Sequence, residues 1–241
     1  MEKFGIGQAV KRKEDDTLII GQGLYIDDIN EPHQAHGFVL RSPHANAKIL
    51  SIESADALKM DGVLAIYTGE DVKEIGPLPC AADTMFKFKR RDGSKRFFPT
   101  HHVLTRKYVR HVGDPVAFIV AETRSQAKDA AEVVFVDYEI LPSVTDTAAA
   151  LAPGAPVIYC EETDGNDAFL FTMGDAEATD AAFATAHKTV RFKHVNQRIV
   201  AASMEPRGCI GMYNSESNRY TLNTNTQSVY RNRAVCAEML G

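Results

Sequence analysis

Residues 113–140 constrain the fold more than any other stretch, because they contain two strand-like segments on either side of a helix-like one. The first segment, PVAFIVA, is apolar and is predicted to be a strand. Thr123 is a suitable N-cap for a helix over TRSQAKDAAEVV, where alanines and Val134 recur at helical spacing. VFVDYEI then alternates apolar and polar residues. This order predicts a right-handed βαβ unit with parallel strand pairing, and therefore an α/β fold.

Three more strands are predicted upstream, in HGFVLRS, AKILSIES and VLAIYTG, after an extended polar arm over residues 1–20. VLAIYTG is apolar, rich in β-formers and bounded by glycines, so it is expected to be a buried strand. Ser54 is placed to cap a short helix, ADALKM, which Asp61 and Gly62 would end. Residues 73–110 contain three prolines and the basic stretch KFKRRDGSKR, so we expect a long surface loop. The basic stretch could bind a phosphate or another anion, but a solvated charged loop is the simpler interpretation.

The second half of the chain begins with residues 143–172, which contain alanine, proline and glycine and are expected to be a linker. A surface helix is predicted over 175–186, a strand over 188–202 and a β-hairpin around 215–218. A last helix is predicted over SVYRNRAVCAEML. Its apolar face comprises Val229, Val235, Cys236, Met239 and Leu240. No stop signal precedes the terminal Gly241, so we expect this chain to be the front portion of a larger protein.

Charge and cysteine content argue against several classes of function. A formal net charge of −5 disfavours nucleic acid as the partner. The four cysteines are widely spaced, which disfavours a zinc or iron–sulfur site and indicates reduced thiols. The charged N-terminus lacks the apolar core of a signal peptide, and no apolar run is long enough to span a membrane. We therefore expect a cytoplasmic protein.

Few local motifs indicate chemistry. A P-loop, a dinucleotide-binding glycine motif and a nucleophile elbow do not occur. His101 and His102 are adjacent and would point apart on a strand, so a metal pair is not expected. Glu205 stands in Met-Glu-Pro-Arg, where an ion pair with Arg207 is the simplest role. Gln227 stands at a predicted strand-to-helix junction, where its amide could donate to an oxyanion or an oxo ligand, or could cap the helix.

Seven segments, in register and in this order, carry a resemblance to one family. They are GQGLYIDDI, HGFVLRSPHANAKI, GVLAIYTGEDV, VRHVGDPVAFIVAET, AAEVVFVDYEILPSV, VNQRIVAASMEPRG and NTQSVYRNRAVCAEMLG. Over about residues 17–241 the chain resembles the N-terminal third of a large, molybdenum-cofactor-binding subunit. The family is that of xanthine dehydrogenase, aldehyde oxidase and carbon monoxide dehydrogenase. The form M-E-P-R-G is closer to carbon monoxide dehydrogenase-like bacterial subunits.

The resemblance implies an α/β (α+β) fold and a domain order. An arm at 1–19 would precede an α/β hammerhead domain at 20–145, which contains the βαβ unit. A linker at 146–172 would lead to the start of a second α+β domain, the molybdopterin-binding domain, at 173–241. The complete enzymes are oxidoreductases that hydroxylate a carbon centre, or oxidise carbon monoxide, at a molybdenum-pterin cofactor, with oxygen from water.

The resemblance also implies partners for this chain. Electrons would leave through two [2Fe-2S] clusters on a small subunit and FAD on a medium subunit. The substrate would be a small molecule, and the assembly a dimer of heterotrimers. Neither the substrate, which could be carbon monoxide, a purine, an aldehyde or another heterocycle, nor the nucleotide form of the pterin follows from these residues.

Residue by residue, the resemblance assigns one cofactor contact to this chain. Gln227 aligns with the family glutamine that donates a hydrogen bond to an oxo ligand of molybdenum. Glu205 and Arg207 align near the core of the cofactor domain and are weaker candidates, structural more often than catalytic. No catalytic residue and no metal ligand is expected, because the family's glycine-rich segment, catalytic glutamate and active-site cysteine loop come later. That cysteine is matched by none of Cys80, Cys160, Cys209 and Cys236.

Two hypotheses for function follow. The first is the front part of a molybdenum hydroxylase large subunit, carbon monoxide dehydrogenase-like, and inactive as an isolated chain. The alternative is a truncated, non-catalytic homologue that acts as a binding or assembly module. An unrelated α/β hydrolase is disfavoured because no nucleophile motif is present.

Overall fold

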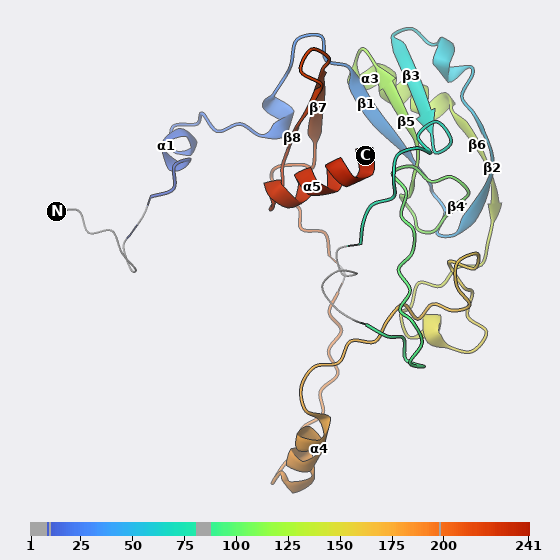
Figure 1. The fold of residues 1–241 in the computed structure, drawn as a ribbon, viewed down its shortest axis with the longest axis vertical. Helices are drawn as coiled ribbons and strands as arrows, with labels where there is room; N and C mark the ends of the chain where they lie inside the picture. Colours follow the sequence, from blue (N-terminus) through green and yellow to red (C-terminus); the bar gives the residue numbers. More distant parts are fainter. Residues whose placement is uncertain (1–8, 10, 81–87, 198) are drawn as a thin grey trace. The chain divides into compact units, whose positions relative to one another are not determined.

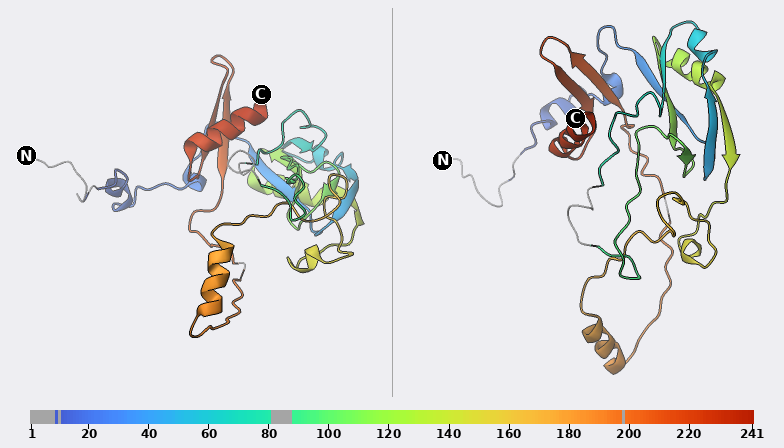
Figure 2. Two further views of the ribbon diagram at one scale, coloured as in Figure 1. Left: turned by 60° about the horizontal axis from the view of Figure 1, so that its bottom comes forward. Right: turned by 45° about the vertical axis from the view of Figure 1, so that its right-hand side comes forward.

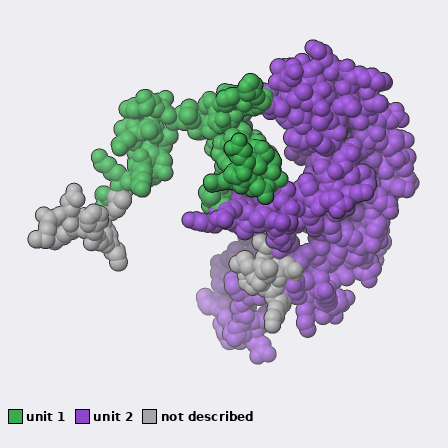
Figure 3. Space-filling view, turned by 45° about the horizontal axis from the view of Figure 1, so that its top comes forward, with its two compact units in different colours: residues 1–34, 194–229 green, residues 35–193, 230–241 purple. Residues whose placement is uncertain are grey.

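The computed structural model describes residue 9 and residues 11–80, 88–197 and 199–241. These residues form two compact units, which Figure 3 colours separately. The small unit combines Met1–Gln34 with His194–Val229. The large unit combines Ala35–Lys193 with Tyr230–Gly241.

The first sheet of the large unit has three antiparallel strands in the order β1-β5-β3 (Figure 1). The strands are β1 (His36–Arg41), β3 (Val63–Thr68) and β5 (Pro115–Ala121). The central strand, β5, buries Val116, Ala117, Ile119 and Ala121 completely. The expectation that VLAIYTG is a buried strand is therefore wrong, because β3 lies at an edge of this sheet and is only partly buried.

The second sheet of the large unit has the order β4-β2-β6, and both pairings are antiparallel. Its strands are β2 (Ala47–Glu53), β4 (Tyr108–Val109) and β6 (Phe135–Ile140). The predicted order of strand, helix and strand over 113–140 is confirmed, but the predicted parallel pairing is wrong. Because β1 and β3 occupy both edges of β5, β6 cannot pair with β5 as predicted. It pairs with β2 instead.

Helix α3 (Arg124–Val133) connects the two sheets and packs on β1 and β5. Thr123 caps it as predicted, since its hydroxyl accepts the backbone N–H of Gln126. The helix buries Ala127, Ala130 and Ala131, and these small side chains allow close approach to the strands. They form one hydrophobic core with β5.

The loops of the large unit depart from expectation in two details. The surface loop predicted over 73–110 ends in β4, whose Val109 is fully buried. Residues Ala57–Lys59 form a single 3₁₀ turn, and the Ser54 hydroxyl does not cap it.

In the basic stretch over 87–96, Arg90 pairs with Asp164 at 3.1 Å and Arg91 with Asp167 at 3.9 Å. The charges of these two arginines are therefore matched within the chain, which disfavours an anion-binding patch. Lys87, the first residue of the stretch, lies outside the described residues.

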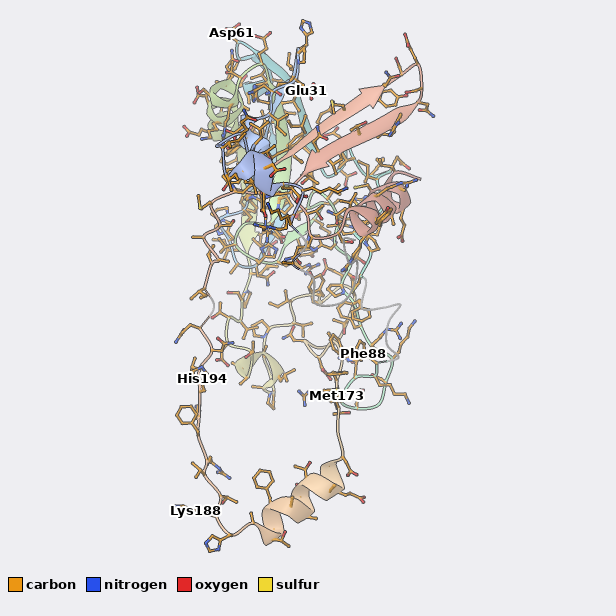
Figure 4. All side chains as sticks on the ribbon, turned by 90° about the vertical axis from the view of Figure 1, so that its left-hand side faces the viewer. Glu31, Asp61, Phe88, Met173, Lys188 and His194 are labelled. Atoms are coloured by element: carbon orange, nitrogen blue, oxygen red, sulfur yellow. The ribbon has the colours of Figure 1, made fainter. Side chains whose placement is uncertain are left out.

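The predicted linker is held together by the hydrogen bonds of one asparagine side chain. The Asn166 amide donates to the carbonyl oxygens of Ala150 and Pro156, and its carbonyl oxygen accepts the N–H of Ile158. Helix α4 (Ala176–Thr185) follows, is capped by Asp175, and buries no residue. Figure 4 shows Met173 and Lys188 on the two chain segments that lead into and out of α4.

The small unit is built around a β-hairpin of β7 (Cys209–Asn214) and β8 (Arg219–Thr224), seen as a two-stranded ribbon in Figure 2. Tyr213 and Tyr220 face each other across the pair, with 4.7 Å between ring centroids. The N-terminal segment contributes the short helix α1 (Asp15–Leu18) and a 3₁₀ turn at Ile26–Asp28. The expectation of a fully extended arm is therefore wrong at α1.

The strand predicted over 188–202 is absent from the described residues of that range. Val190 and Phe192 are 83% and 81% exposed. An alternating pattern forms a strand only when a second strand supplies hydrogen bonds, and no partner strand pairs with these residues in the described part of the chain.

The predicted C-terminal helix is confirmed as α5 (Val229–Leu240), whose predicted apolar face is not buried. Its Met239 carbonyl oxygen accepts the N–H of Gly76 at 3.1 Å. Across the residues that were described, no helix is long and apolar enough to cross a bilayer.

Candidate functional site

The hairpin brings together the two segments that carry the candidate residues. Glu205 and Arg207 precede β7, and Gln227 follows β8. Because the strands are antiparallel, Cys209 at the start of β7 pairs with Thr224 at the end of β8. Both candidate segments therefore leave the same, open end of the hairpin.

Two side-chain hydrogen bonds fasten these segments to each other. The Thr224 hydroxyl donates to the carbonyl oxygen of Gly208 at 2.9 Å. The Asn225 amide donates from Nδ2 to the carbonyl oxygen of Pro206 at 3.2 Å. The loop before β7 and the junction after β8 are thus one connected structure.

Glu205 is part of this structure through its carboxylate. Its Oε1 accepts the backbone N–H of Ile26 at 3.2 Å, and its carbonyl oxygen accepts the Ser203 hydroxyl at 2.9 Å. Ile26 is 8% exposed and also lies against Gly208, where an added Cβ would stand 2.8 Å from Ile26 Cγ2. Glu205 therefore anchors the N-terminal 3₁₀ turn to the loop.

The ion pair predicted between Glu205 and Arg207 is wrong, because no such pair forms between these two described residues. The Glu205 carboxylate is directed to the backbone of a segment distant in sequence. The side chain of Arg207 is exposed.

Gln227 is exposed at the junction between Thr224, which ends β8, and Val229, which begins α5. The Ser228 N–H donates to the Thr226 hydroxyl at 3.1 Å, which closes a turn across Gln227. The Gln227 side chain makes no hydrogen bond to the described residues, so the capping alternative is not observed. Its two amide N–H donors are accessible to an external acceptor.

The histidines and cysteines do not assemble into a metal site. No group of three His, Cys, Asp or Glu side chains suited to a metal occurs among the residues that could be searched. Burial, followed by the charge of Arg106, lowers the pKa of His102 and favours its neutral form. All four cysteines are free thiols, and only Cys236 is partly buried.

A cavity of about 390 Å³ in the large unit was not predicted from the sequence. It is lined by Arg106, Arg110, Tyr159, Glu161 and Glu162, among others. Two of its carboxylates have partners, since Glu161 lies 2.8 Å from Arg110 and Glu162 accepts from the hydroxyl of Thr100. The lining comes from segments about fifty residues apart, so no local motif signals it.

Comparisons with known proteins identify both halves of the chain. The family "aldehyde oxidase and xanthine dehydrogenase, a/b hammerhead domain" matches residues 20–142. The family "molybdopterin cofactor-binding domain" matches residues 160–241.

Individual relatives agree with these family matches. The nicotine 6-hydroxylase large subunit of Paenarthrobacter nicotinovorans is 34% identical over 228 residues, covering 92% of this chain and 26% of the relative. The carbon monoxide dehydrogenase large chain of Hydrogenophaga pseudoflava is 32% identical, covering 95% of this chain and 28% of the relative.

Solved structures confirm the fold. Quinoline 2-oxidoreductase from Pseudomonas putida 86 superposes with a TM-score of 0.81 at 32% identity, covering 99% of this chain and 29% of that one. The chain thus spans a little over a quarter of the length of these relatives. The resemblance read from the seven segments is confirmed: this chain belongs to the aldehyde oxidase and xanthine dehydrogenase family of molybdenum-dependent oxidoreductases, and corresponds to part of their cofactor-binding large subunit.

Proposed function

We propose that this chain forms the hammerhead domain and the first part of the molybdopterin-binding domain of a molybdenum hydroxylase large subunit. The observation that carries the proposal is the exposed, unpartnered amide of Gln227 at a braced strand-to-helix junction. We divide the chain into an arm at 1–19, a hammerhead domain at 20–145, a linker at 146–172 and the cofactor domain from 173. The family matches to 20–142 and 160–241 support the order of the two domains, although the second match begins within the proposed linker.

The residues present fit a cofactor that brings its own metal ligands. The described part of the chain has no cluster of metal-binding side chains, whereas a pterin dithiolene holds molybdenum through its own sulfurs. When bound, the cofactor supplies the two-electron oxidation with oxygen from water. A neutral amide N–H is a suitable donor to an oxo acceptor, because it supplies a hydrogen bond without adding charge.

Roles for this chain's residues follow from their contacts. Gln227 would donate from its amide to an oxo ligand of the bound cofactor and would help to orient it. Arg207 is exposed in the adjoining loop and is a weaker second candidate for contacting the cofactor. Glu205 is committed to the N–H of Ile26, so its role is structural. No residue of this chain acts as the catalytic acid or base.

Partners are proposed from the organisation of the relatives. One relative is named a large chain and another subunit gamma of a dehydrogenase complex. Electrons would pass to a small [2Fe-2S] subunit and a medium FAD subunit, within a dimer of heterotrimers that acts on a small-molecule substrate.

The four free thiols favour the cytoplasm as the location of the enzyme. We place the enzyme with the carbon monoxide dehydrogenase-like branch because of its M-E-P-R-G segment.

The test is substitution of Gln227 in the natural-length polypeptide, assembled with its cofactor and partner subunits. Gln227→Ala removes the donor, and kcat is expected to fall by about 10- to 1,000-fold with molybdenum content unchanged. Gln197→Ala is the matched control, since Gln197 is also an exposed glutamine of the small unit. Full activity of Gln227→Ala on every substrate that the enzyme turns over would overturn the assignment.

A second arm addresses the isolated chain. Residues 1–241 alone are expected to show no turnover with carbon monoxide, purines or aldehydes, because no catalytic acid or base is assigned to them. Measurable oxidation by the purified chain would show that the catalytic group lies within it.

A further inference from the structure

The turn that carries Gln227 is held by the side chains on either side of it. Before Gln227, Asn225 Nδ2 donates to the carbonyl oxygen of Pro206 at 3.2 Å. Across Gln227, the Ser228 N–H donates to the Thr226 hydroxyl at 3.1 Å. Since the Gln227 side chain has no partner among the described residues, its position depends on neighbouring contacts such as these two.

The partner of Asn225 is itself fixed. Pro206 has a restricted φ, and the residue before it, Glu205, is tied to Ile26 by its carboxylate and to Ser203 by its carbonyl oxygen. The Thr224 hydroxyl adds a second bond to the same loop, at Gly208. A hydrogen bond to Pro206 therefore connects the junction to a braced segment rather than to a free loop.

We propose that Asn225 and Thr226 are positioning residues that set where the Gln227 amide lies, an inference that rests on the proposed function of Gln227. A glutamine side chain has three rotatable bonds, so it reaches a fixed acceptor only if its backbone is held. Asn225 and Thr226 supply side-chain contacts that hold the residues between β8 and α5, beside a longer contact of 3.4 Å from the Thr224 hydroxyl to the Asn225 carbonyl oxygen. A misplacement of about 1 Å costs a catalytic group up to about 100-fold in rate.

Two near-isosteric variants remove these contacts. Asn225→Asp keeps the size of the side chain but replaces the donor by a carboxylate that faces the Pro206 carbonyl oxygen. Thr226→Val keeps the shape but removes the hydroxyl that accepts the Ser228 N–H. Asn223→Asp and Thr221→Val are the matched controls, because those β8 side chains make no hydrogen bond in the described structure.

The experiment uses the natural-length large subunit in its assembled, cofactor-loaded form. Amide hydrogen exchange over residues 225–229 is expected to be about 3- to 10-fold faster in Asn225→Asp and Thr226→Val, and unchanged in the controls. In the same variants kcat is expected to fall by about 10-fold, with KM and molybdenum content unchanged. Gln227→Ala serves as the comparator, since it should lower kcat without changing this exchange.

The outcomes separate the two proposals. Wild-type exchange and wild-type kcat in both variants, with a low kcat in Gln227→Ala, would overturn the positioning role alone. Faster exchange with an unchanged kcat would also overturn it, because the contacts would then be structural only. An unchanged kcat in Gln227→Ala would overturn the proposed function of Gln227, and the positioning role with it.

Discussion

The guanidinium of Arg110 lies over the ring of Tyr159, with 4.1 Å between Cζ and the ring centroid. The same guanidinium is 2.8 Å from Glu161 and donates to the carbonyl oxygen of Ile158. Arg110 directly follows β4, whereas the other three residues belong to the segment expected to be a linker. One arginine therefore attaches that segment to the end of a strand in the same unit.

Replacing Arg110 should loosen this attachment. Arg110→Lys keeps the charge but loses the planar fork and most of the ring stacking, so we expect a loss of about 2 kcal/mol in the free energy of unfolding. Urea denaturation measures this loss of stability, and amide hydrogen exchange over residues 157–162 should become faster in the same variant. Arg191→Lys is the control, because Arg191 is exposed and has no described ion pair. Equal stability of the two variants would contradict the role of Arg110.

Glu161 should make this attachment dependent on pH. Burial alone raises the pKa of Glu161, but the hydrogen bond and positive charge of Arg110 outweigh it and lower the pKa below the ordinary 4.5. A carboxyl whose pKa is depressed by folding adds stability above its unfolded pKa, and that stability is lost as the pH falls through the folded pKa. Glu161→Gln should therefore be less stable than wild type at about pH 7, with the difference shrinking towards about pH 3. An equal difference at both pH values would exclude the carboxylate as its source.

Most local elements of this chain follow from its sequence, because their periodicity is a local property, but the strand expected over 188–202 does not form in the described residues. Thr123 and the alanines of α3 mark a helix, and the apolar run of β5 marks a strand. The pairing of β6 does not follow, since it depends on which sheet edges are free after β1 and β3 have paired with β5. That is decided by the whole fold rather than by residues 113–140.

The candidate site also has one part that could be predicted from the sequence and one part that could not. The junction position of Gln227 follows from the predicted hairpin and helix, and the structure has both. The partner of Glu205 does not follow, because Ile26 is 179 positions away and contributes only a backbone N–H. A local pairing of Glu205 with Arg207 is the obvious expectation from spacing, and it fails for that reason.

Gly208 should be intolerant of a side chain. A Cβ there would lie 2.8 Å from Ile26 Cγ2, so Gly208→Ala must displace Ile26 or the loop, at a cost of about 1–3 kcal/mol. Hydrogen exchange of the Ile26 amide measures the effect. This N–H donates to Glu205, and its exchange should become faster when the contact is lost.

Gly211→Ala provides the control for that substitution. A Cβ at Gly211, in β7, meets no atom within 4 Å, so the variant should keep wild-type protection at Ile26. Combining Gly208→Ala with Ile26→Ala should restore part of the loss, because the clashing methyl is removed. Additive losses in the double variant would show that contact with Ile26 is not the cause.

The two capped helices should respond differently to loss of their caps. The Thr123 hydroxyl accepts the Gln126 N–H at 3.3 Å, and α3 contributes three buried alanines to the core. Thr123→Ala should therefore lower the free energy of global unfolding by about 1 kcal/mol. Urea denaturation followed by far-UV circular dichroism measures the change.

Asp175→Ala removes an equally well-formed cap but should leave global unfolding unchanged. Asp175 accepts the Ala178 N–H at 2.9 Å, yet α4 buries no residue. An exposed helix of this length is marginal without packing, so loss of its cap melts it locally while the core stays folded. Exchange over 176–185 should rise with no shift in the urea midpoint. A midpoint shift as large as that of Thr123→Ala would show that α4 is coupled to the core.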